Sequence, residues 1–211
     1  MARVRKISTM AELQAAMQAA FNAINRDFYN GELEKCVISV KEGRKDGVLG
    51  TFYNSKDWIQ SGTARHEITI SANYIGQRTV VETITTLMQE MVHLYCFQND
   101  IKDTSRSGTY HNKNFKREAE NHGLDIELAD KIGWSVTKPK PATEQWIKDN
   151  IPIRSFGIYK QVAEKIPGNG TSKPKQSMRK KVCPCCGNIA RVTSEFKLIC
   201  GECNEEMKEE N

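Results

Sequence analysis

The most informative segment of this chain is Met88-Gln89-Glu90-Met91-Val92-His93-Leu94. In a helix, positions 89 and 93 are four residues apart and therefore share one face, with Glu90 beside them. This is the layout of the pattern His-Glu-x-x-His, in which two histidines bind zinc and the glutamate takes a proton from water. Gln89 stands at the position of the first histidine.

The residues before this stretch predict where its helix begins. Thr79-Val80-Val81-Glu82 is a capping box, which satisfies the free N–H groups of a first helical turn. The apolar residues that follow recur at helical spacing to about Gln98. They are Ile84, Leu87, Met88, Met91, Leu94 and Tyr95. An unpaired carboxylate such as Glu90 is costly to bury on so apolar a helix, which favours a role for it in the chemistry of the site.

The elements around this helix predict an α+β fold. A second capping box at Thr9 and Glu12 starts a helix over 10–29. Segments 36–40 and 48–53 favour two strands paired across a turn at 43–47, and 66–71 favours a third strand. After a polar loop over 99–110, a further helix covers 112–122. We therefore expect a helix, a small antiparallel sheet, the Glu90 helix and a further helix in a first domain over 1–135.

The composition changes after Trp134. Residues 136–182 hold eleven basic and three acidic side chains, whereas residues 1–135 balance at zero. The dipeptides Lys138-Pro139 and Lys140-Pro141 indicate a linker, so we expect a basic linker over 136–180 with a short helix at 143–150 and a short strand at 156–159. A positive segment of this kind is typical of contact with an anionic partner, and the alternative is a solvated linker. The candidate phosphate contacts are Lys173, Lys175, Arg179, Lys180 and Lys181.

Five of the seven cysteines lie within the last thirty residues and predict a metal site. Cys183 and Cys186 form one Cys-x-x-Cys pair, and Cys200 and Cys203 form a second. Four thiolates at this spacing suit one tetrahedral structural zinc in a zinc ribbon over 181–206, with strands at 190–193 and 196–199. Cys185 is left free, with a redox role as the lesser alternative. Residues 207–211 are an acidic tail.

Several of these motifs together resemble the SprT-like family of zinc metallopeptidases, which includes the Spartan proteases. The matching segments are Glu90–Tyr95 on the helix, Lys102–Ser105 in the loop, Gly108–Phe115, the strand Glu67–Ser71 and the C-terminal cysteines. The resemblance covers about residues 8–135 and 181–206. It implies a zincin-like SprT domain, followed by a small zinc ribbon whose ligands are four cysteines.

The resemblance also implies roles for individual residues. His93 and His111 would bind a second zinc at the active site, Glu90 would be the general base, and Gln89 would occupy the remaining ligand position. A neutral amide oxygen binds zinc less well than an imidazole, so two histidines alone would hold the metal weakly. Tyr110 is a candidate to stabilise the oxyanion, the alternative being a packing role. His66 reads as a strand residue, and His122 as a helix-end residue too far from His111 to share an ion.

The function implied is zinc-dependent proteolysis of proteins that are bound or crosslinked to DNA. Gln89 leaves open an alternative, a non-catalytic module that binds nucleic acid or protein through the ribbon and the basic linker. A weaker reading is a transcription-associated factor, because zinc ribbons are frequent in that class. The chain lacks an apolar run of membrane-spanning length, and no apolar segment follows its basic start, so we expect a cytoplasmic protein, with a nucleoid location as a variant of this.

Overall fold

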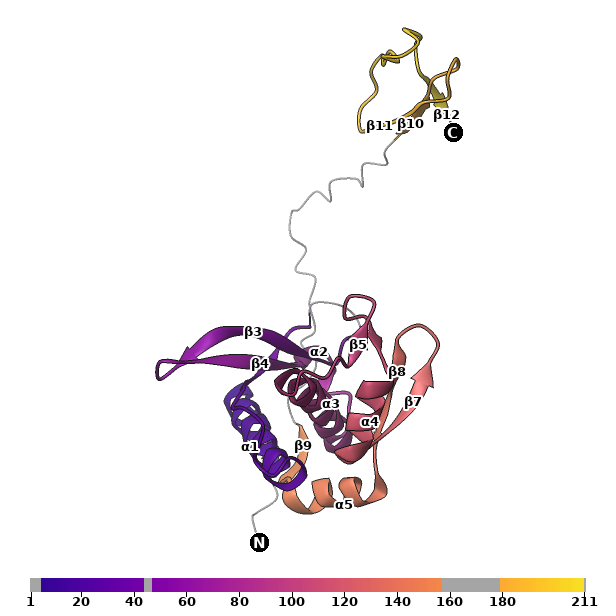
Figure 1. Ribbon diagram of the computed structural model, residues 1–211. Coiled ribbons are helices and arrows are strands. Elements are labelled where there is room, and N and C mark those ends of the chain that lie inside the picture. The colour runs from indigo at the N-terminus through magenta and orange to yellow at the C-terminus, as the bar shows by residue number, and fades with distance from the viewer. Residues whose placement is uncertain (1–4, 44–46, 157–178, 211) are drawn as a thin grey trace. The chain divides into compact units, whose positions relative to one another are not determined.

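The computed structural model describes residues 5–43, 47–156 and 179–210, and the chain divides into two compact units, Met1–Val162 and Ala163–Asn211. The first unit is a mixed α and β structure, as expected (Figure 1). Its elements are β1 (Arg5–Ile7), α1 (Met10–Phe28), β2 (Val37–Lys41), β3 (Gly50–Gln60), β4 (Thr63–Ser71), α2 (Ala72–Ile75), α3 (Val80–Gln98), β5 (Thr104–Ser105), β6 (Tyr110–His111), α4 (Lys113–Asn121), β7 (Leu124–Ala129), β8 (Gly133–Pro139), α5 (Pro141–Asn150) and β9 (Ile153–Phe156). The second unit holds β10 (Arg179–Val182), β11 (Ile189–Val192) and β12 (Lys208–Glu210).

Both long helices begin at the predicted capping boxes. The Thr9 hydroxyl accepts from the Glu12 N–H in α1, and the Thr79 hydroxyl accepts from the Glu82 N–H in α3. Each glutamate reaches back to the backbone N–H of its threonine, so two otherwise unpaired donors are satisfied at each helix start. The apolar faces of α1 and α3 lie in one core with β2 and β4. This core fixes the orientation of α3, the helix that carries Glu90.

The strand pairing in the first sheet differs from the pairing that we predicted. Its strand order is β2-β4-β3, with β2 parallel to β4 and β3 antiparallel to β4. We expected segment 36–40 to pair with 48–53 across the turn at 43–47 in an antiparallel sheet, and this pairing is wrong. The parallel arrangement places the alternate apolar residues Ile38 and Val40 of β2 beside Ile68 and Ile70 of β4, all in the core.

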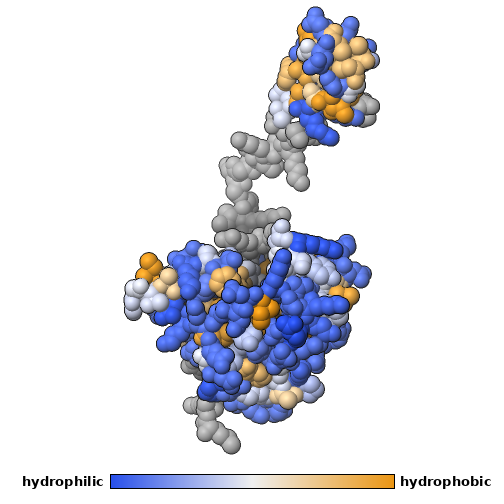
Figure 2. All heavy atoms as spheres, in the orientation of Figure 1, coloured by the Kyte–Doolittle hydropathy of each residue, from blue (hydrophilic) through white to orange (hydrophobic). Residues whose placement is uncertain are grey.

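The β3–β4 hairpin extends beyond the core as an arm, which we define as residues 54–65. The register of the two strands shifts between Tyr53 and Trp58, a bulge that bends the strand. Most of the arm is exposed, including Trp58 and Ile59 near its turn. Figure 1 shows the arm projecting from the helices, and Figure 2 shows apolar surface at its end.

A second sheet follows α3, with strand order β5-β6-β8-β7. Its strands β7 and β8 form an antiparallel hairpin over 124–139. We expected the first domain to end at residue 135, but β8 continues to Pro139, so Lys138 and Pro139 are strand residues rather than a linker. Strand β8 packs against α3, so this hairpin lies beside the helix that carries Glu90.

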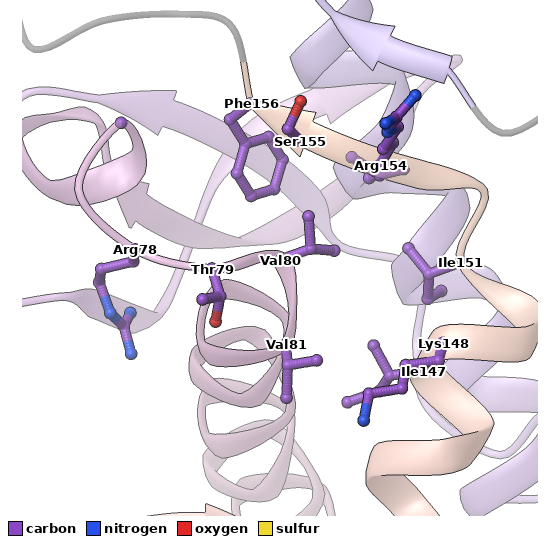
Figure 3. Close-up of a pocket in the computed structure, with 12 residues that line it drawn as sticks. Arg78, Thr79, Val80, Val81, Ile147, Lys148, Ile151, Arg154, Ser155 and Phe156 are labelled. Carbon is purple, nitrogen blue, oxygen red and sulfur yellow. The ribbon is translucent and has the colours of Figure 1, made fainter.

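The first unit continues beyond β8. Helix α5 confirms the predicted short helix, and β9 lies three residues earlier than the strand expected over 156–159, of which 157–159 are outside the described residues. Strand β9 pairs in parallel with β1. A cavity of about 530 Å³ lies between α3, α5 and β9 and shares no lining residue with the pocket at Glu90. Its walls combine apolar residues with the charged side chains of Arg78, Lys148 and Arg154 (Figure 3).

The second unit is a three-stranded sheet with order β11-β10-β12. Strand β11 confirms the first predicted ribbon strand within one residue. Segment 196–199 is not a strand: Ile199 makes one isolated bridge with Glu206. Residues 208–210, which we assigned to an acidic tail, form β12 and pair with β10. Among the described residues of both units, no helix has the length and apolar character needed to cross a bilayer.

Candidate active site and cysteine cluster

Four predicted site residues meet in one pocket of about 530 Å³. Helix α3 supplies Gln89, Glu90 and His93, and β6 supplies His111. The ring centres of His93 and His111 lie 4.9 Å apart. The spacing of Gln89 and His93 therefore correctly predicted that they face the same pocket. The second sheet adds His111 to this pocket from a later part of the chain.

Glu90 is buried at the base of this pocket. Its carboxylate is held in place because Oε2 accepts the backbone N–H of Phe52 on β3 at 2.9 Å. Burial raises the pKa of Glu90, although the charge of His93 and the Phe52 hydrogen bond act in the opposite direction. A carboxyl with a raised pKa is a stronger base, as proton transfer from water requires.

His93 is oriented by Asp103, which precedes β5. The His93 Nδ1 and the Asp103 Oδ2 are 2.5 Å apart. Burial alone would lower the pKa of His93, but the hydrogen bond to Asp103 and the charges of Glu90 and Asp103 outweigh it, so that the pKa is raised. With Nδ1 donating to the carboxylate, Nε2 is the nitrogen left for a metal, an arrangement typical of zinc-binding histidines.

His111 is held in the same way by β8. Its Nδ1 lies 2.9 Å from the Ser135 hydroxyl, whose proton is donated to the Ile132 carbonyl. Ser135 therefore accepts from Nδ1–H, and the lone pair of His111 is on Nε2. Burial, followed by the charge of His93, lowers the pKa of His111 to about 4, which keeps the ring neutral at physiological pH. Phe115 stacks on the rings of both histidines.

Gln89 is half-buried, and Thr137 of β8 fixes its side chain. The Thr137 hydroxyl donates to Gln89 Oε1 at 2.8 Å. One lone pair of the amide oxygen is thus already used. Strand β8 in this way contacts two members of the site, since Ser135 and Thr137 lie two residues apart on the same face of the strand.

The other candidate residues lie outside this pocket. Tyr110 is not among the pocket residues, and its ring lies under the Arg106 guanidinium, which fits the packing alternative. His66 is buried on β4 beside Phe97, in agreement with its reading as a strand residue. His122 caps the end of α4 and stacks on Tyr29; burial is the main cause of its lowered pKa.

The donor set fits a zinc ion held by two imidazoles. With Nδ1 of each ring engaged by a protein partner, Nε2 of His93 and Nε2 of His111 are the nitrogens that would bind the metal, and the Nδ1 partners match those of metal-bound histidines. The set is one imidazole short of the three protein ligands of usual catalytic zinc sites. Within the described part of the chain, only the cysteine cluster brings three or more His, Cys, Asp or Glu ligands close enough for one ion.

Sequence reasoning missed the three partners Asp103, Ser135 and Thr137. Asp103 belongs to the loop segment that carried the resemblance, but a lone aspartate in a polar loop gives no sign of its contact. Ser135 and Thr137 alternate on a strand that spans the boundary expected between the first domain (1–135) and the linker (136–180). The strict apolar–polar alternation of Leu124-Asp125-Ile126-Glu127-Leu128 was the signal that could have revealed this hairpin.

The fold and site together define a metallopeptidase-type domain. The SprT-like family profile matches residues 17–129, which is more than half of the chain. The protein belongs to the SprT-like family. No curated protein matches the chain.

The cysteine cluster has the geometry of one metal site. The Sγ atoms of Cys183, Cys186, Cys200 and Cys203 all lie within 4.8 Å of one another. The two knuckles have matching backbone: Gly187 and Asn204, each directly after the second cysteine of its pair, adopt positive φ values of 74° and 56°. Each also donates its N–H to the carbonyl of the first cysteine of the pair. Cys185 is exposed, in line with its omission from the ligand set.

The five predicted phosphate contacts are differently placed. Lys173 and Lys175 lie outside the described residues. Arg179 pairs with Glu195 at 3.1 Å, and Lys181 is buried with its ammonium donating to the Phe196 carbonyl at 2.6 Å. Lys180 is half-buried on β10. Lys181 therefore supports the ribbon structure, and the hypothesis of phosphate binding rests on the other residues.

Replacing Asp103 by asparagine is expected to weaken metal binding at His93. An asparagine in this place cannot supply the carboxylate charge that increases the basicity of the imidazole, and such partners contribute about 10- to 100-fold in metal affinity. Cobalt(II) absorption on the full chain, with zinc loaded only at the cysteine cluster, would measure the affinity at this site. Asp100→Asn, an exposed aspartate in the same loop, is the matched control. Equal cobalt affinities for the two variants would contradict the role given to Asp103.

Proposed function

We propose that this chain is a SprT-type zinc-dependent metallopeptidase that acts on proteins bound or crosslinked to DNA. The observation that supports peptidase chemistry is the meeting of Glu90, His93 and His111 in one pocket, with both histidine Nδ1 atoms engaged by protein partners. Each of these side chains is held before substrate arrives, which is the condition for efficient catalysis.

In the proposed hydrolysis, metal binding and proton transfer are carried out by different residues of the chain. Zinc, when bound, polarises the scissile carbonyl and increases the acidity of water. His93 and His111 would hold it through Nε2. Glu90 Oε2 is occupied by the Phe52 N–H, so Oε1 is the oxygen that takes the proton from the attacking water and returns it to the leaving amine.

Gln89 limits the proposed activity because it lowers the zinc affinity of the site. With one imidazole fewer, the site holds zinc more weakly, and the fraction of active protein depends on the free zinc concentration. The hydrogen bond from Thr137 also draws electron density from the amide oxygen that would complete the site. The proposed enzyme is therefore active in proportion to its metal occupancy.

A non-catalytic binding module is the second candidate, and one observation favours it. Among the described residues, the cysteine cluster is the only group of three or more His, Cys, Asp or Glu side chains that could hold an ion. In this case the SprT-like domain is a scaffold, and the ribbon and the basic residues before it bind the partner.

A zinc count with a matched cleavage assay separates the two candidates. At saturating zinc, we expect two ions per chain and zinc-dependent cleavage of a DNA-binding protein in the presence of DNA. Glu90→Gln should keep both ions and lose about 10²- to 10⁴-fold in rate, the usual contribution of a general base. Glu127→Gln, at an exposed carboxylate on β7, should behave as the native chain. A single ion and no cleavage would establish the binding module instead.

DNA binding is expected to weaken steeply with salt, because lysine contacts to phosphates release counterions. The variant with Lys173, Lys175 and Lys180 changed to alanine should bind duplex DNA less tightly and have a log–log salt slope shallower by about 2.7, that is, about 0.9 for each lysine. The control changes the exposed residues Lys35, Lys113 and Lys131 to alanine, with the same loss of charge. Fluorescence anisotropy of labelled DNA over a salt series measures both. An unchanged slope in the first variant would remove these lysines from the interface.

A further inference from the structure

The cavity between α3, α5 and β9 has no part in the proposed hydrolysis, because none of its lining residues belongs to the pocket at Glu90. We call it the α3–α5 cavity. Its lining residues come from the start of α3 and the turn before it, from the end of α5, and from β9. Its volume of about 530 Å³ lies within the range of about 300–1,000 Å³ that is typical of small-molecule sites.

Much of the wall of this cavity is apolar. Six of the lining residues are Val80, Val81, Ile147, Ile151, Ile153 and Phe156. Figure 3 shows Val80 and Val81 on the α3 side of the space and Ile147 and Ile151 on the opposite side. Val80, Val81 and Phe156 are only half-buried, so they leave apolar surface in contact with solvent. An apolar molecule in this space would remove that surface from water, which is favourable.

The charged residues that line the cavity are all cations, namely Arg78, Lys148 and Arg154. The Lys148 Nζ is paired with Glu144 Oε1 of α5 at 2.6 Å. Burial lowers the pKa of Arg78, and the nearby charge of Glu82 opposes this shift. Arg154 is exposed and forms no ion pair with any residue that the structure describes. One positive charge is therefore in excess around the cavity, and Arg154 carries it.

The backbone at the start of α3 does not supply a further anion site. The Glu82 N–H donates to Thr79 Oγ1 at 3.2 Å, and the Thr79 N–H donates to Glu82 Oε2 at 2.7 Å. Glu82 thus already places a carboxylate at the positive end of the helix. An anion in the cavity must be held by a side chain, and a guanidinium can donate two parallel hydrogen bonds to one carboxylate.

This combination of one excess charge and an apolar wall selects the class of ligand. A polyanion such as nucleic acid needs cations repeated along its path, and the cavity offers only one that is unpaired. A neutral apolar molecule would gain from burial alone. A molecule that joins an apolar body to a single carboxylate gains from burial and from a charge-assisted hydrogen bond to Arg154.

We propose that the α3–α5 cavity binds a small amphipathic monoanion, a carboxylate carried on an aliphatic or aromatic body. The body packs between Val81 and Ile147, and the carboxylate lies against Arg154. This inference goes beyond the proposed function and does not depend on it, since the two sites share no lining residue.

The test is isothermal titration calorimetry of decanoate, a ten-carbon aliphatic carboxylate, into the full chain. One molecule should bind per chain, at least about tenfold more tightly than 1-decanol, a difference of about 1.4 kcal/mol. The alcohol has the same aliphatic chain without the charge. Decylammonium, whose charge is reversed, should bind more weakly than the alcohol. Equal affinities for the three molecules, or no binding of decanoate, would overturn the proposal.

Two variants locate the bound molecule. Arg154→Gln should raise the dissociation constant of decanoate about tenfold and leave that of 1-decanol within about twofold, because only the charged contact is lost. The matched control is Arg191→Gln, at an exposed arginine on β11, which should change neither. Val81→Phe places a larger side chain in the space between α3 and α5 and should abolish binding of both molecules.

Circular dichroism establishes that each variant is folded. Arg154 is exposed, so Arg154→Gln decides the question even where Val81→Phe is unstable. Unchanged decanoate affinity in Arg154→Gln, an equal loss in Arg191→Gln, or undiminished binding by a folded Val81→Phe chain would each contradict the assignment of this cavity. None of these measurements involves cleavage, so their outcome is separate from that of the peptidase proposal.

Discussion

Gln89→His is expected to raise the zinc affinity of the active site by about 100-fold or more, because a third imidazole replaces a neutral amide. The site then has three nitrogen ligands and one open position for water. Its neighbours support the change: Thr137 is within hydrogen-bonding distance of the side chain at 89 and can orient a ring nitrogen that faces away from the metal. Zinc content and cleavage rate of DNA-bound protein are measured for the native and variant chains at limiting zinc.

A double variant separates metal binding from proton transfer. Adding Glu90→Gln to Gln89→His should keep the gain in zinc affinity and abolish the gain in cleavage, because the ligand and the base are different residues. Gln98→His, on the last turn of the same helix, is the control for adding a histidine to α3. If Gln89→His changes neither zinc affinity nor rate, residue 89 does not contribute to a metal site.

Cys183→Ser or Cys200→Ser is expected to unfold the described second unit, residues 179–210, and to leave the first unit intact. The described core of this unit is small, with Cys183, Cys200 and Met207 as its buried cluster, so we expect its folding to depend on a metal held by the four cysteines. Structural zinc contributes about 10–16 kcal/mol of apparent binding free energy in comparable small domains. Zinc content, limited proteolysis and circular dichroism measure the loss.

Cys185→Ser is the matched control for this experiment. Cys185 lies beside the ligand Cys186 in sequence but is exposed and outside the cluster of four. The variant should retain its zinc and its resistance to protease. A Cys183→Ser chain that still resisted proteolysis over 179–210 would show that the cysteines do not hold the unit together.

The helices of this protein could be predicted from sequence because their signals are local. The capping threonines Thr9 and Thr79 and the apolar spacing after them determine α1 and α3 within a few residues. Strand pairing is not local. Segment 36–40 has a glycine-rich turn after it and a strand beyond, which favours a hairpin, yet its partner β4 lies thirty residues away. The core selects this partner because the apolar residues on one face of β2 and of β4 are buried together, and no short window of sequence contains that information.

The same difference between local and non-local signals explains which residues of the candidate site could be predicted from the sequence. Gln89, Glu90 and His93 could be placed together because one helix carries them, and the resemblance supplied His111. Asp103 and Ser135 could not be found, since a polar residue that supports a ligand looks in sequence like any surface residue. Their contacts exist only once the second sheet has formed beside α3.

The pairing of β1 with β9 has a consequence for biosynthesis. Arg5 pairs with Ile153, so the first strand emerges from the ribosome long before its partner has been made. At translation rates of about 5–20 residues per second, the delay is on the order of 7–30 s. During this time Ile7, which is fully buried in the finished protein, has no sheet partner. The first unit can therefore close only late in synthesis, and its nascent chain must remain free of aggregation until residue 156 is available.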